Sequence, residues 1–317
     1  MDTRYAPVFL SHGSPMTALQ PGAAGEFWRD LGRVIDGRVA AGESPPAAIV
    51  ALSAHTLARR AVTLAGARHA AIHDFGGFPQ ALYDLRYETA GVPCLAPHVE
   101  QLLQWAGIEV EHADAGGLDH GIWVPLRSIR PRGDIPVLPV GFPPDRTPEQ
   151  LFELGAALGS LVDEGVWIIG TGSITHNLRL GLPRPDPVRE IPASAAFRAW
   201  FADRSAARDW AALFRYRALA PEAAFMHPTD EHLLPWFIAA GAGGRGHGPV
   251  RVHASVAGGH LGMDAYAFGA EAPALAGALE ALPAQDALPA LEPLQTVEAL
   301  RAKEPGEPAT ARPSSCA

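Results

Sequence analysis

Short apolar runs alternate with longer amphipathic stretches through most of the chain, and this rhythm restricts its fold more than any other feature. Short apolar runs are typical of buried strands, whereas apolar residues spaced three and four apart are typical of helices. Strands are predicted at Pro7–Leu10, Ala47–Ser53, Ala61–Ala65, Ile108–His112, Ile135–Gly141, Val166–Gly170, Val250–Val256 and Met263–Phe268. Helices are predicted at Gly25–Ala40, Pro93–Ala106, Pro148–Glu164, Ser194–Ser205, Ala207–Arg217 and Asp230–Ala242. The alternation favours an α/β fold, a single domain with a central, mostly parallel mixed sheet flanked by helices.

Two of these helices begin with capping signals. Thr147 precedes a proline and is followed three positions later by Gln150, the pattern of a capped amino terminus. Thr229 is the expected N-cap of the helix over 230–242, which places His232 in its first turn. The stretch 181–193 contains four prolines. It is expected to be a loop, because proline donates no backbone hydrogen bond and does not fit a helix interior.

The composition changes after residue 270. Residues 271–317 contain thirteen alanines and seven prolines and no aromatic residue. Such a segment cannot bury enough apolar surface to offset the entropy lost on ordering. We therefore expect one functional domain over residues 1–270 and a disordered Ala/Pro-rich tail over 271–317, with room for short helical turns near 274–282.

Charge and cysteine content exclude several classes of protein. The 317 residues include 34 acidic and 25 basic ones, a net charge of −9. Nucleic acid is therefore not an expected partner, because phosphate binding needs clustered positive charge. Apolar runs are too short for membrane helices. Only Cys94 and Cys316 occur, which excludes a disulfide framework and favours the cytoplasm. We expect a monomer or a small homo-oligomer.

Several of the thirteen histidines lie where strands are predicted to end. His12 and His55 close the first two predicted strands, His176 follows the run VWIIGTGSIT, and His120 follows a Gly-Gly turn; His232 lies beside a predicted helix start. In open α/β sheets, ligands bind outside the carboxyl ends of the strands. The active site is therefore expected at this edge of the sheet.

Convergent imidazoles predict a metal site. Imidazole is the commonest neutral metal ligand, and two or three of them leave open positions on a divalent ion, as in non-haem iron(II) oxygenases and catalytic zinc sites. No Cys₂His₂ or H-E-x-x-H pattern is present. The G-x-G at 170–172 lacks the third glycine of a dinucleotide loop, and no G-x-S-x-G elbow of a serine hydrolase occurs. The residues alone leave the identity of the metal open.

Seven motifs in order resemble one family. They are FLSHGSPM (9–16), SAH (53–55), HDFGGFPQALYDLRY (73–87), DHGIWVPL (119–126), GTGSITHNLR (170–179), HPTDEHLLP (227–235) and MDAYAFG (263–269). Together they resemble the DODA-type extradiol aromatic ring-opening dioxygenases, in the class III extradiol group that includes DOPA dioxygenases. The resemblance covers residues 8 to about 269.

The resemblance implies roles for five histidines. His12, His55 and His232 would be the metal ligands. His176 would be the acid/base residue, and it would approach the metal as a fourth ligand in a zinc-loaded, substrate-free form. His120 would face the substrate and O₂. Other class III enzymes use a glutamate as the third ligand, and Glu231 precedes His232, but the histidine is the residue that matches the motif.

The resemblance also implies a substrate pocket and a reaction. The segment with His73 would line the substrate entrance, where Phe75, Phe78 and Tyr83 would provide an aromatic wall. The activity would be insertion of O₂ into a catechol-type ring next to the diol, with iron(II) as the working ion, because zinc does not change oxidation state. Zinc(II) would occupy the same site in isolated protein. Partners would be a small aromatic diol and O₂.

Two departures from the family pattern concern the pocket. Thr56 follows the second histidine, where an aromatic residue is common, and Gly259-His260-Leu261-Gly262 replaces a serine-rich step. The sequence leaves two alternatives to the dioxygenase. One is a zinc-dependent hydrolase that uses the same histidine cluster, and the other is a metal-free binding scaffold.

Overall fold

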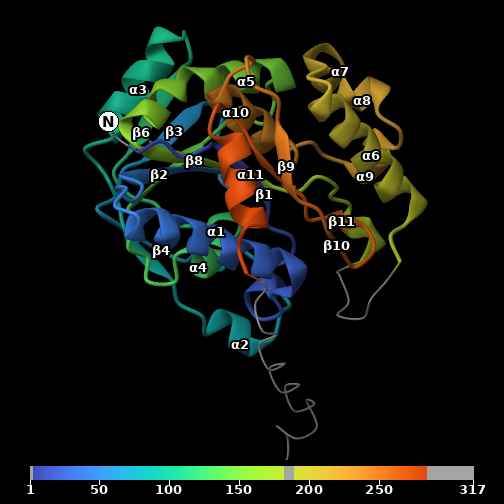
Figure 1. Cartoon of the computed structure of the whole chain (residues 1–317), viewed down its shortest axis with the longest axis horizontal. Helices are drawn as coiled ribbons and strands as arrows, with labels where there is room; N and C mark the ends of the chain where they lie inside the picture. Colours follow the sequence, from blue (N-terminus) through green and yellow to red (C-terminus); the bar gives the residue numbers. More distant parts are fainter. Residues whose placement is uncertain (1–2, 182–188, 284–317) are drawn as a thin grey trace, which may run out of the picture. The chain divides into compact units, whose positions relative to one another are not determined.

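A computed structural model describes residues 3–181 and 189–283, and its centre is an eight-stranded sheet (Figure 1). In spatial order its strands are β6 (Val110–Ala113), β3 (Ala61–Leu64), β7 (Val137–Gly141), β2 (Ala48–Ser53), β8 (Val166–Gly172), β1 (Val8–Ser11), β12 (Ala265–Ala267) and β9 (Val250–His253). These are the eight strands predicted from the apolar runs. The prediction of an α/β fold with a mixed, mostly parallel sheet is confirmed.

The middle of the sheet is parallel. Strands β7, β2, β8 and β1 pair in parallel, whereas β12 runs antiparallel to both β1 and β9. On the other side β3 is antiparallel to β7 and parallel to β6. The carboxyl ends of β1, β2 and β8 therefore lie side by side at one edge of the sheet.

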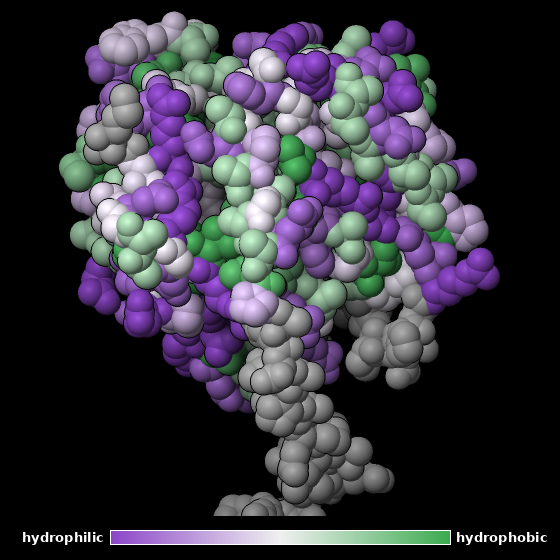
Figure 2. Space-filling model, viewed as in Figure 1, coloured by the Kyte–Doolittle hydropathy of each residue, from purple (hydrophilic) through white to green (hydrophobic). Residues whose placement is uncertain are grey.

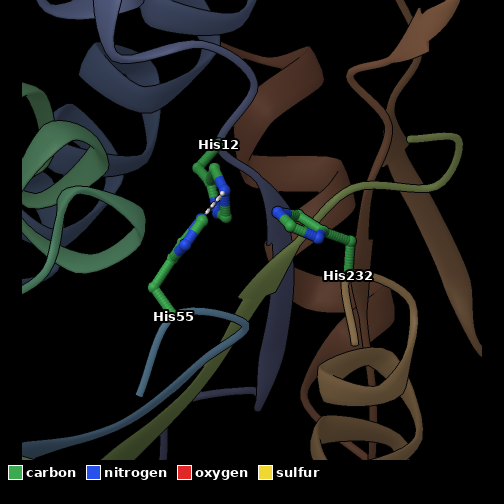
Figure 3. A group of neighbouring side chains, drawn as sticks. All are labelled: His12, His55 and His232. Atoms are coloured by element: carbon green, nitrogen blue, oxygen red, sulfur yellow. Dashed lines mark hydrogen bonds between the residues drawn. The ribbon is translucent and has the colours of Figure 1, made fainter. Parts of the chain in front are cut away.

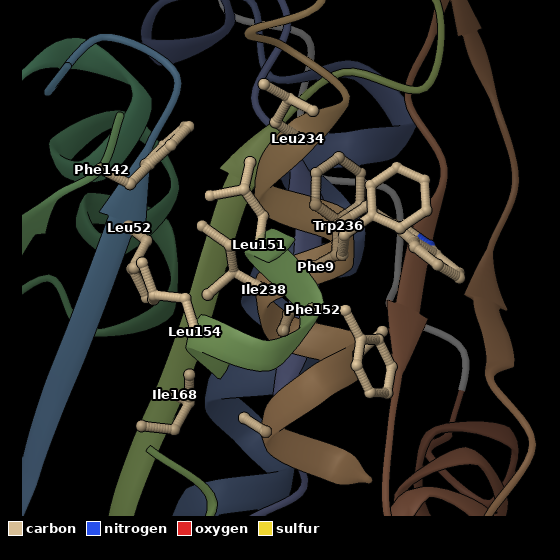
Figure 4. Packing of buried hydrophobic residues seen from close by; sticks show 14 of the residues in the cluster. Phe9, Leu52, Phe142, Leu151, Phe152, Leu154, Ile168, Leu234, Trp236 and Ile238 are labelled. Carbon is tan, nitrogen blue, oxygen red and sulfur yellow. The ribbon is translucent and has the colours of Figure 1, made fainter. Parts of the chain in front are cut away.

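Helices cover both faces of the sheet. The residues that alternate along β1, β2 and β8 divide between two apolar clusters, as expected when both faces are buried. One face is covered by α1 (Gly22–Ala40), α4 (His120–Ile129) and α11 (Ala272–Glu280). The other is covered by α3 (Ala96–Trp105), α5 (Pro148–Ala157) and α10 (Leu234–Gly243). Figure 4 shows Phe9, Leu52 and Ile168 of the strands packed with Trp236 and Ile238 of α10.

Further elements connect this framework. The helices α6 (Pro192–Ala206), α7 (Trp210–Phe214), α8 (Tyr216–Leu219) and α9 (Ala223–Met226) precede α10. The remaining elements are η1 (Pro15–Ala18), η2 (Gly159–Glu164), η3 (Leu178–Leu180), α2 (Gln80–Tyr83) and the strand pairs β4 (Arg68–Ala70) with β5 (Glu88–Ala90) and β10 (Val256–Ala257) with β11 (Leu261–Gly262). Within the described residues, no helix is both long and apolar enough to cross a membrane.

The capping predictions have opposite outcomes. Thr147 forms the predicted capping box, accepting from the Gln150 N–H while the Gln150 side chain accepts from the Thr147 N–H. The prediction that Thr229 caps a helix with His232 in its first turn is wrong. Helix α10 begins only at Leu234, and the Thr229 hydroxyl donates to Glu231 instead. His232 therefore lies in a turn before the helix, where its ring can face the sheet edge.

Other helix boundaries also differ from the predictions. The helix expected over 148–164 is divided into α5 and η2, and the one expected over 207–217 is divided between α7 and α8. Helix α11 occupies the start of the segment expected to be a disordered tail, and its residue Ala272 is fully buried. The rest of that segment, from residue 284, and residues 182–188 of the proline-rich loop lie outside the described residues. On the face shown in Figure 2, hydrophilic and hydrophobic side chains are interspersed around α11.

Candidate active site

The strand-end histidines converge at the carboxyl edge of the sheet (Figure 3). His12 directly follows β1, and His55 follows β2 by one residue. Their Nε2 atoms lie 3.1 Å apart. The ring of His232 lies 5.5 Å from that of His12 and 5.0 Å from that of His55, centroid to centroid. One ring nitrogen from each of the three lies within 4.8 Å of the others, so the structure brings together the three predicted ligands.

His232 reaches the cluster because its turn packs directly on β8. The Ser173 N–H donates to the His232 carbonyl oxygen at 2.8 Å. A Cβ atom on Gly172 would lie only 1.9 Å from that oxygen, so the position admits no side chain. The Nδ1 of His232 lies 3.1 Å from the Glu231 carboxylate, while the Nε2 of His232 is buried without a hydrogen-bond partner. The Glu231 carboxylate therefore holds the ring of its neighbour.

The His55 turn is held by a buried carboxylate. Asp119 accepts hydrogen bonds from the hydroxyls of Ser53 at 2.6 Å and Thr56 at 2.5 Å, one on each side of His55. The Ser53 oxygen also accepts from the His55 backbone N–H at 3.2 Å. Burial raises the pKa of Asp119, and the two hydroxyl donors oppose this effect. Thr56 thus stabilises the turn that carries His55.

Asp74 connects two histidines. Its Oδ1 lies 3.0 Å from Nδ1 of His120 and accepts from the His120 backbone N–H at the same distance. Its Oδ2 lies 3.9 Å from Nδ1 of His55. Burial raises the pKa of Asp74, but the hydrogen bonds from His120 and the charges of His120 and His55 together outweigh burial, so the net shift is downward. An ionised Asp74 thereby accepts the Nδ1 proton of His120 and fixes the orientation of its ring.

The clustered imidazoles are neutral. Burial, followed by repulsion from the neighbouring histidines, lowers the pKa of His12 well below its usual range. The same two causes lower the pKa of His55 to about 3. Burial lowers the pKa of His232 although Glu231 opposes it. A neutral imidazole has a lone pair available for a cation, so the three rings are in the state that metal binding requires.

His176 stacks on His232. The ring centroids are 3.4 Å apart, and the planes are within 8° of parallel. Burial, and then the neighbouring His232, lower the pKa of His176 to about 2. A nitrogen of His176 also lies within 4.8 Å of the nearest ring nitrogen of His232 and a carboxylate oxygen of Glu231. The ring is therefore a neutral base next to the three-histidine cluster.

An aromatic cluster extends from His120 toward the surface. The ring of Phe75 lies 5.7 Å from that of His120, 5.3 Å from Phe78 and 5.4 Å from Tyr83. His73 packs against Phe75 and Tyr83, with centroids 5.6 and 5.8 Å away, and its Nε2 is buried without a partner. The structure thus brings together all four residues predicted to line the substrate pocket.

The residues present fit a divalent cation. The partnerless Nε2 of His232 and the close approach of two other Nε2 atoms leave nitrogen lone pairs directed at one region. Three neutral imidazoles would leave most of the positive charge of a bound cation uncompensated, which would favour an anionic group as its further ligand. A sheet that gathers such a cluster at its carboxyl edge defines an α/β metalloenzyme.

Comparison with known proteins identifies the family. Residues 7–269 match the catalytic LigB subunit of aromatic ring-opening dioxygenase. The chain is 34% identical over 265 residues to a 4,5-DOPA dioxygenase extradiol of Beta vulgaris, covering 82% of this chain and 95% of that protein. It is 33% identical over 245 residues to the protein of the same name from Escherichia coli K12, covering 76% and 86%. The crystal structure of uncharacterized protein JW3007 from Escherichia coli K12 has a TM-score of 0.66 at 26% identity, covering 83% of this chain and 98% of that one.

The chain belongs to the LigB family of class III extradiol dioxygenases, which are aromatic ring-opening enzymes. This finding confirms the predicted resemblance and favours the dioxygenase over the zinc-dependent hydrolase and the metal-free scaffold. Sequence reasoning missed the hydrogen-bonding role of Thr171, whose Oγ1 lies 2.7 Å from Nδ1 of His12. Its position in the GTGS step after a strand was visible, but a buried threonine in a strand is usually explained by packing alone.

Proposed function

We propose that the chain is an iron(II)-dependent extradiol dioxygenase that opens a catechol-type ring, with His12, His55 and His232 as the metal ligands. The observation that carries this proposal is the convergence of three neutral imidazoles at the carboxyl edge of the sheet. When bound, iron(II) would supply electron transfer between the diol and O₂, for which redox-inert zinc(II) is unsuited. Zinc(II) would still occupy the site in isolated protein, because imidazole suits both ions.

His176 is proposed as the acid/base residue. Its ring stacks on His232, a position from which an imidazole can take a proton from a catechol hydroxyl and later return one to the opened product. The Nδ1 of His120 is held by Asp74, and the ring lies 4.0 Å from that of His55, centroid to centroid. This position suits a donor or acceptor of a hydrogen bond to the substrate or O₂.

The aromatic cluster is proposed to bind the substrate. The rings of His73, Phe75, Phe78 and Tyr83 lie on the His120 side of the metal site, where they can exclude water and stack on a flat diol. The relatives named 4,5-DOPA dioxygenase extradiol make DOPA a reasonable first substrate for a screen. Simpler catechols belong in the same screen.

The proposal predicts that variants of the proposed ligands lose both metal and activity, whereas a variant of the proposed acid/base residue loses activity alone. The purified protein, loaded with iron(II) without air, should consume O₂ when a catechol is added. The variants H12A, H55A and H232A should lose both metal and turnover. The variant H176Q should retain metal, while kcat falls about 10²–10⁴-fold. Metal content by elemental analysis and O₂ uptake with an electrode measure the two effects. Metal loss in H176Q with retention in H232A would reverse the assigned roles.

A further inference from the structure

We propose that Thr171 is a positioning residue that fixes the tautomer of His12, so that Nε2 of this ring is bare before a cation arrives. The inference rests on the proposed role of His12 as a ligand. Thr171 lies in β8 between β1 and β2, where it pairs with Leu10 and Ser53, and it is 1% exposed. Its hydroxyl has no access to solvent, so its partners in the protein decide its orientation.

The acceptor for this hydroxyl exists because of a proline inside a helix. In an α-helix, the carbonyl of Gly121 would accept from the N–H of the residue four positions later. That residue is Pro125, which lies within α4 and has no N–H. The Gly121 carbonyl oxygen instead lies 2.6 Å from Thr171 Oγ1 and accepts its proton.

The direction of the next hydrogen bond follows from counting protons. A threonine hydroxyl has one proton, and a carbonyl oxygen can only accept. The Thr171 proton therefore belongs to the bond with Gly121. The contact of 2.7 Å between Thr171 Oγ1 and Nδ1 of His12 then requires the proton on Nδ1. A neutral His12 with a proton on Nδ1 has its lone pair on Nε2, the atom that faces His55.

Close packing holds the ring in this orientation. A Cβ atom on Gly121 would lie 3.0 Å from Cε1 of His12 and 2.5 Å from the Ser53 hydroxyl. The absence of a side chain at residue 121 therefore lets the helix start lie against the imidazole. The Gly121 carbonyl, which Pro125 leaves without a helical donor, thus accepts from Thr171, and Thr171 in turn fixes the orientation of His12.

Metal titration of three variants tests the inference. Zinc(II), and iron(II) without air, are titrated into chelator-treated protein. The variant T171V keeps the side-chain shape and removes the acceptor, so metal affinity should fall about 10–100-fold. The variant T171S restores the hydroxyl and should bind as the wild type does. The matched control is T89V, because the buried Thr89 hydroxyl donates to Ile135 at 2.8 Å and touches no site residue.

Nitrogen-15 NMR of histidine-labelled, metal-free protein provides a readout that does not depend on turnover. His12 should have a proton on Nδ1 in the wild type and T171S, and T171V should populate the other tautomer. A proton on Nε2 of wild-type His12, or unchanged affinity in T171V, overturns the inference. Failure of the proposed function looks different, since the wild type would then bind no metal, or bind iron(II) without consuming O₂.

Discussion

At the residue scale, the partner of Nδ1 distinguishes histidines that the sequence presents as equivalent. Thr171, Glu231 and Asp74 hold the Nδ1 atoms of His12, His232 and His120. A hydroxyl, an adjacent carboxylate and a carboxylate from another loop thereby fix the orientation of three imidazole rings. Such partners orient metal ligands and contribute to affinity even though they do not touch the ion.

Thr56, the residue that departs from the family pattern, has a testable energetic role. Its hydroxyl donates to the buried carboxylate of Asp119. The variant T56V should lower the free energy of unfolding by about 1.5–3 kcal/mol, the usual value of a hydrogen bond to a charged group. Urea unfolding at neutral pH measures the loss as a lower midpoint with an unchanged slope.

A double-mutant cycle separates this bond from simple packing. In a D119N background the carboxylate charge is absent, so T56V should cost less than it does in the wild type. An equal cost in both backgrounds would mean that Thr56 acts by filling space. The same cycle with S53A should behave similarly, because Ser53 donates to the other carboxylate oxygen.

Sequence reasoning reached the residues but not their hydrogen bonds. Strand ends are local features of hydrophobic pattern, so the positions of His12, His55 and His176 could be predicted from short windows. The acceptors of His12 and His120 come from distant parts of the chain, as with Thr171, which is 159 positions from His12. Such pairings depend on strand order, which the apolar pattern does not encode.

At the element scale, strands were more predictable than helices. The eight predicted runs all became strands of the main sheet, and its central strands β7, β2, β8 and β1 are almost continuously apolar because both of their faces are buried. Helix α4 was missed, since the glycine and proline in HGIWVPLRSI argue against a helix. Its tertiary setting compensates, because the carbonyl freed by Pro125 finds a donor in Thr171.

The crossing of α5 and α10 depends on two glycines. A Cβ atom on Gly155 would lie 1.9 Å from the Ile238 carbonyl oxygen, and one on Gly241 would lie 1.9 Å from the Phe152 carbonyl oxygen. The helices are therefore in direct backbone contact. The variant G241A should lower the free energy of unfolding by about 1–3 kcal/mol, since the helices must separate to admit a methyl group.

The matched control for this prediction is G37A in α1. Gly37 is also helical, but no atom lies within 4 Å of an added Cβ there. This variant should stabilise the protein by about 0.5–1 kcal/mol, because alanine loses less backbone entropy than glycine. Urea midpoints that shift in the same direction for both variants would contradict the proposed close contact.

At the scale of the whole molecule, the buried histidines make the free energy of unfolding depend on pH. Burial lowers the pKa of a group of imidazoles that would titrate normally in the unfolded chain. They are His12, His55, His176, His227, His232 and His253. As the pH falls below about 6.5, the unfolded chain binds protons that the folded chain does not. Stability must therefore decrease with falling pH.

The size of this effect follows from the number of protons. Each imidazole that is protonated only on unfolding contributes up to about 1.4 kcal/mol per pH unit. The loss should begin near pH 6.5; the contribution of His227 ends near pH 4, where the folded ring itself takes up a proton, whereas that of His55 continues to about pH 3. Urea midpoints of chelator-treated protein between pH 7.5 and 5 should therefore fall steeply, and a flat profile would contradict the burial of neutral rings.

Two variants test whether the buried histidine rings cause the dependence of stability on pH. The variant H227Q removes one buried imidazole, so its stability should depend on pH less steeply than that of the wild type.

His112 has the opposite shift, because its hydrogen bond to Glu100 raises its pKa. Such a group stabilises the folded state at pH below about 6.5, and that contribution disappears as the pH rises through the raised pKa. The variant H112Q should therefore make the profile no shallower, and a shallower profile in H112Q would place the titrating groups on the surface. Bound metal should raise the free energy of unfolding without flattening the profile above about pH 6, because the folded rings carry no extra proton there with or without the cation, and the slope arises from protonation of the unfolded chain.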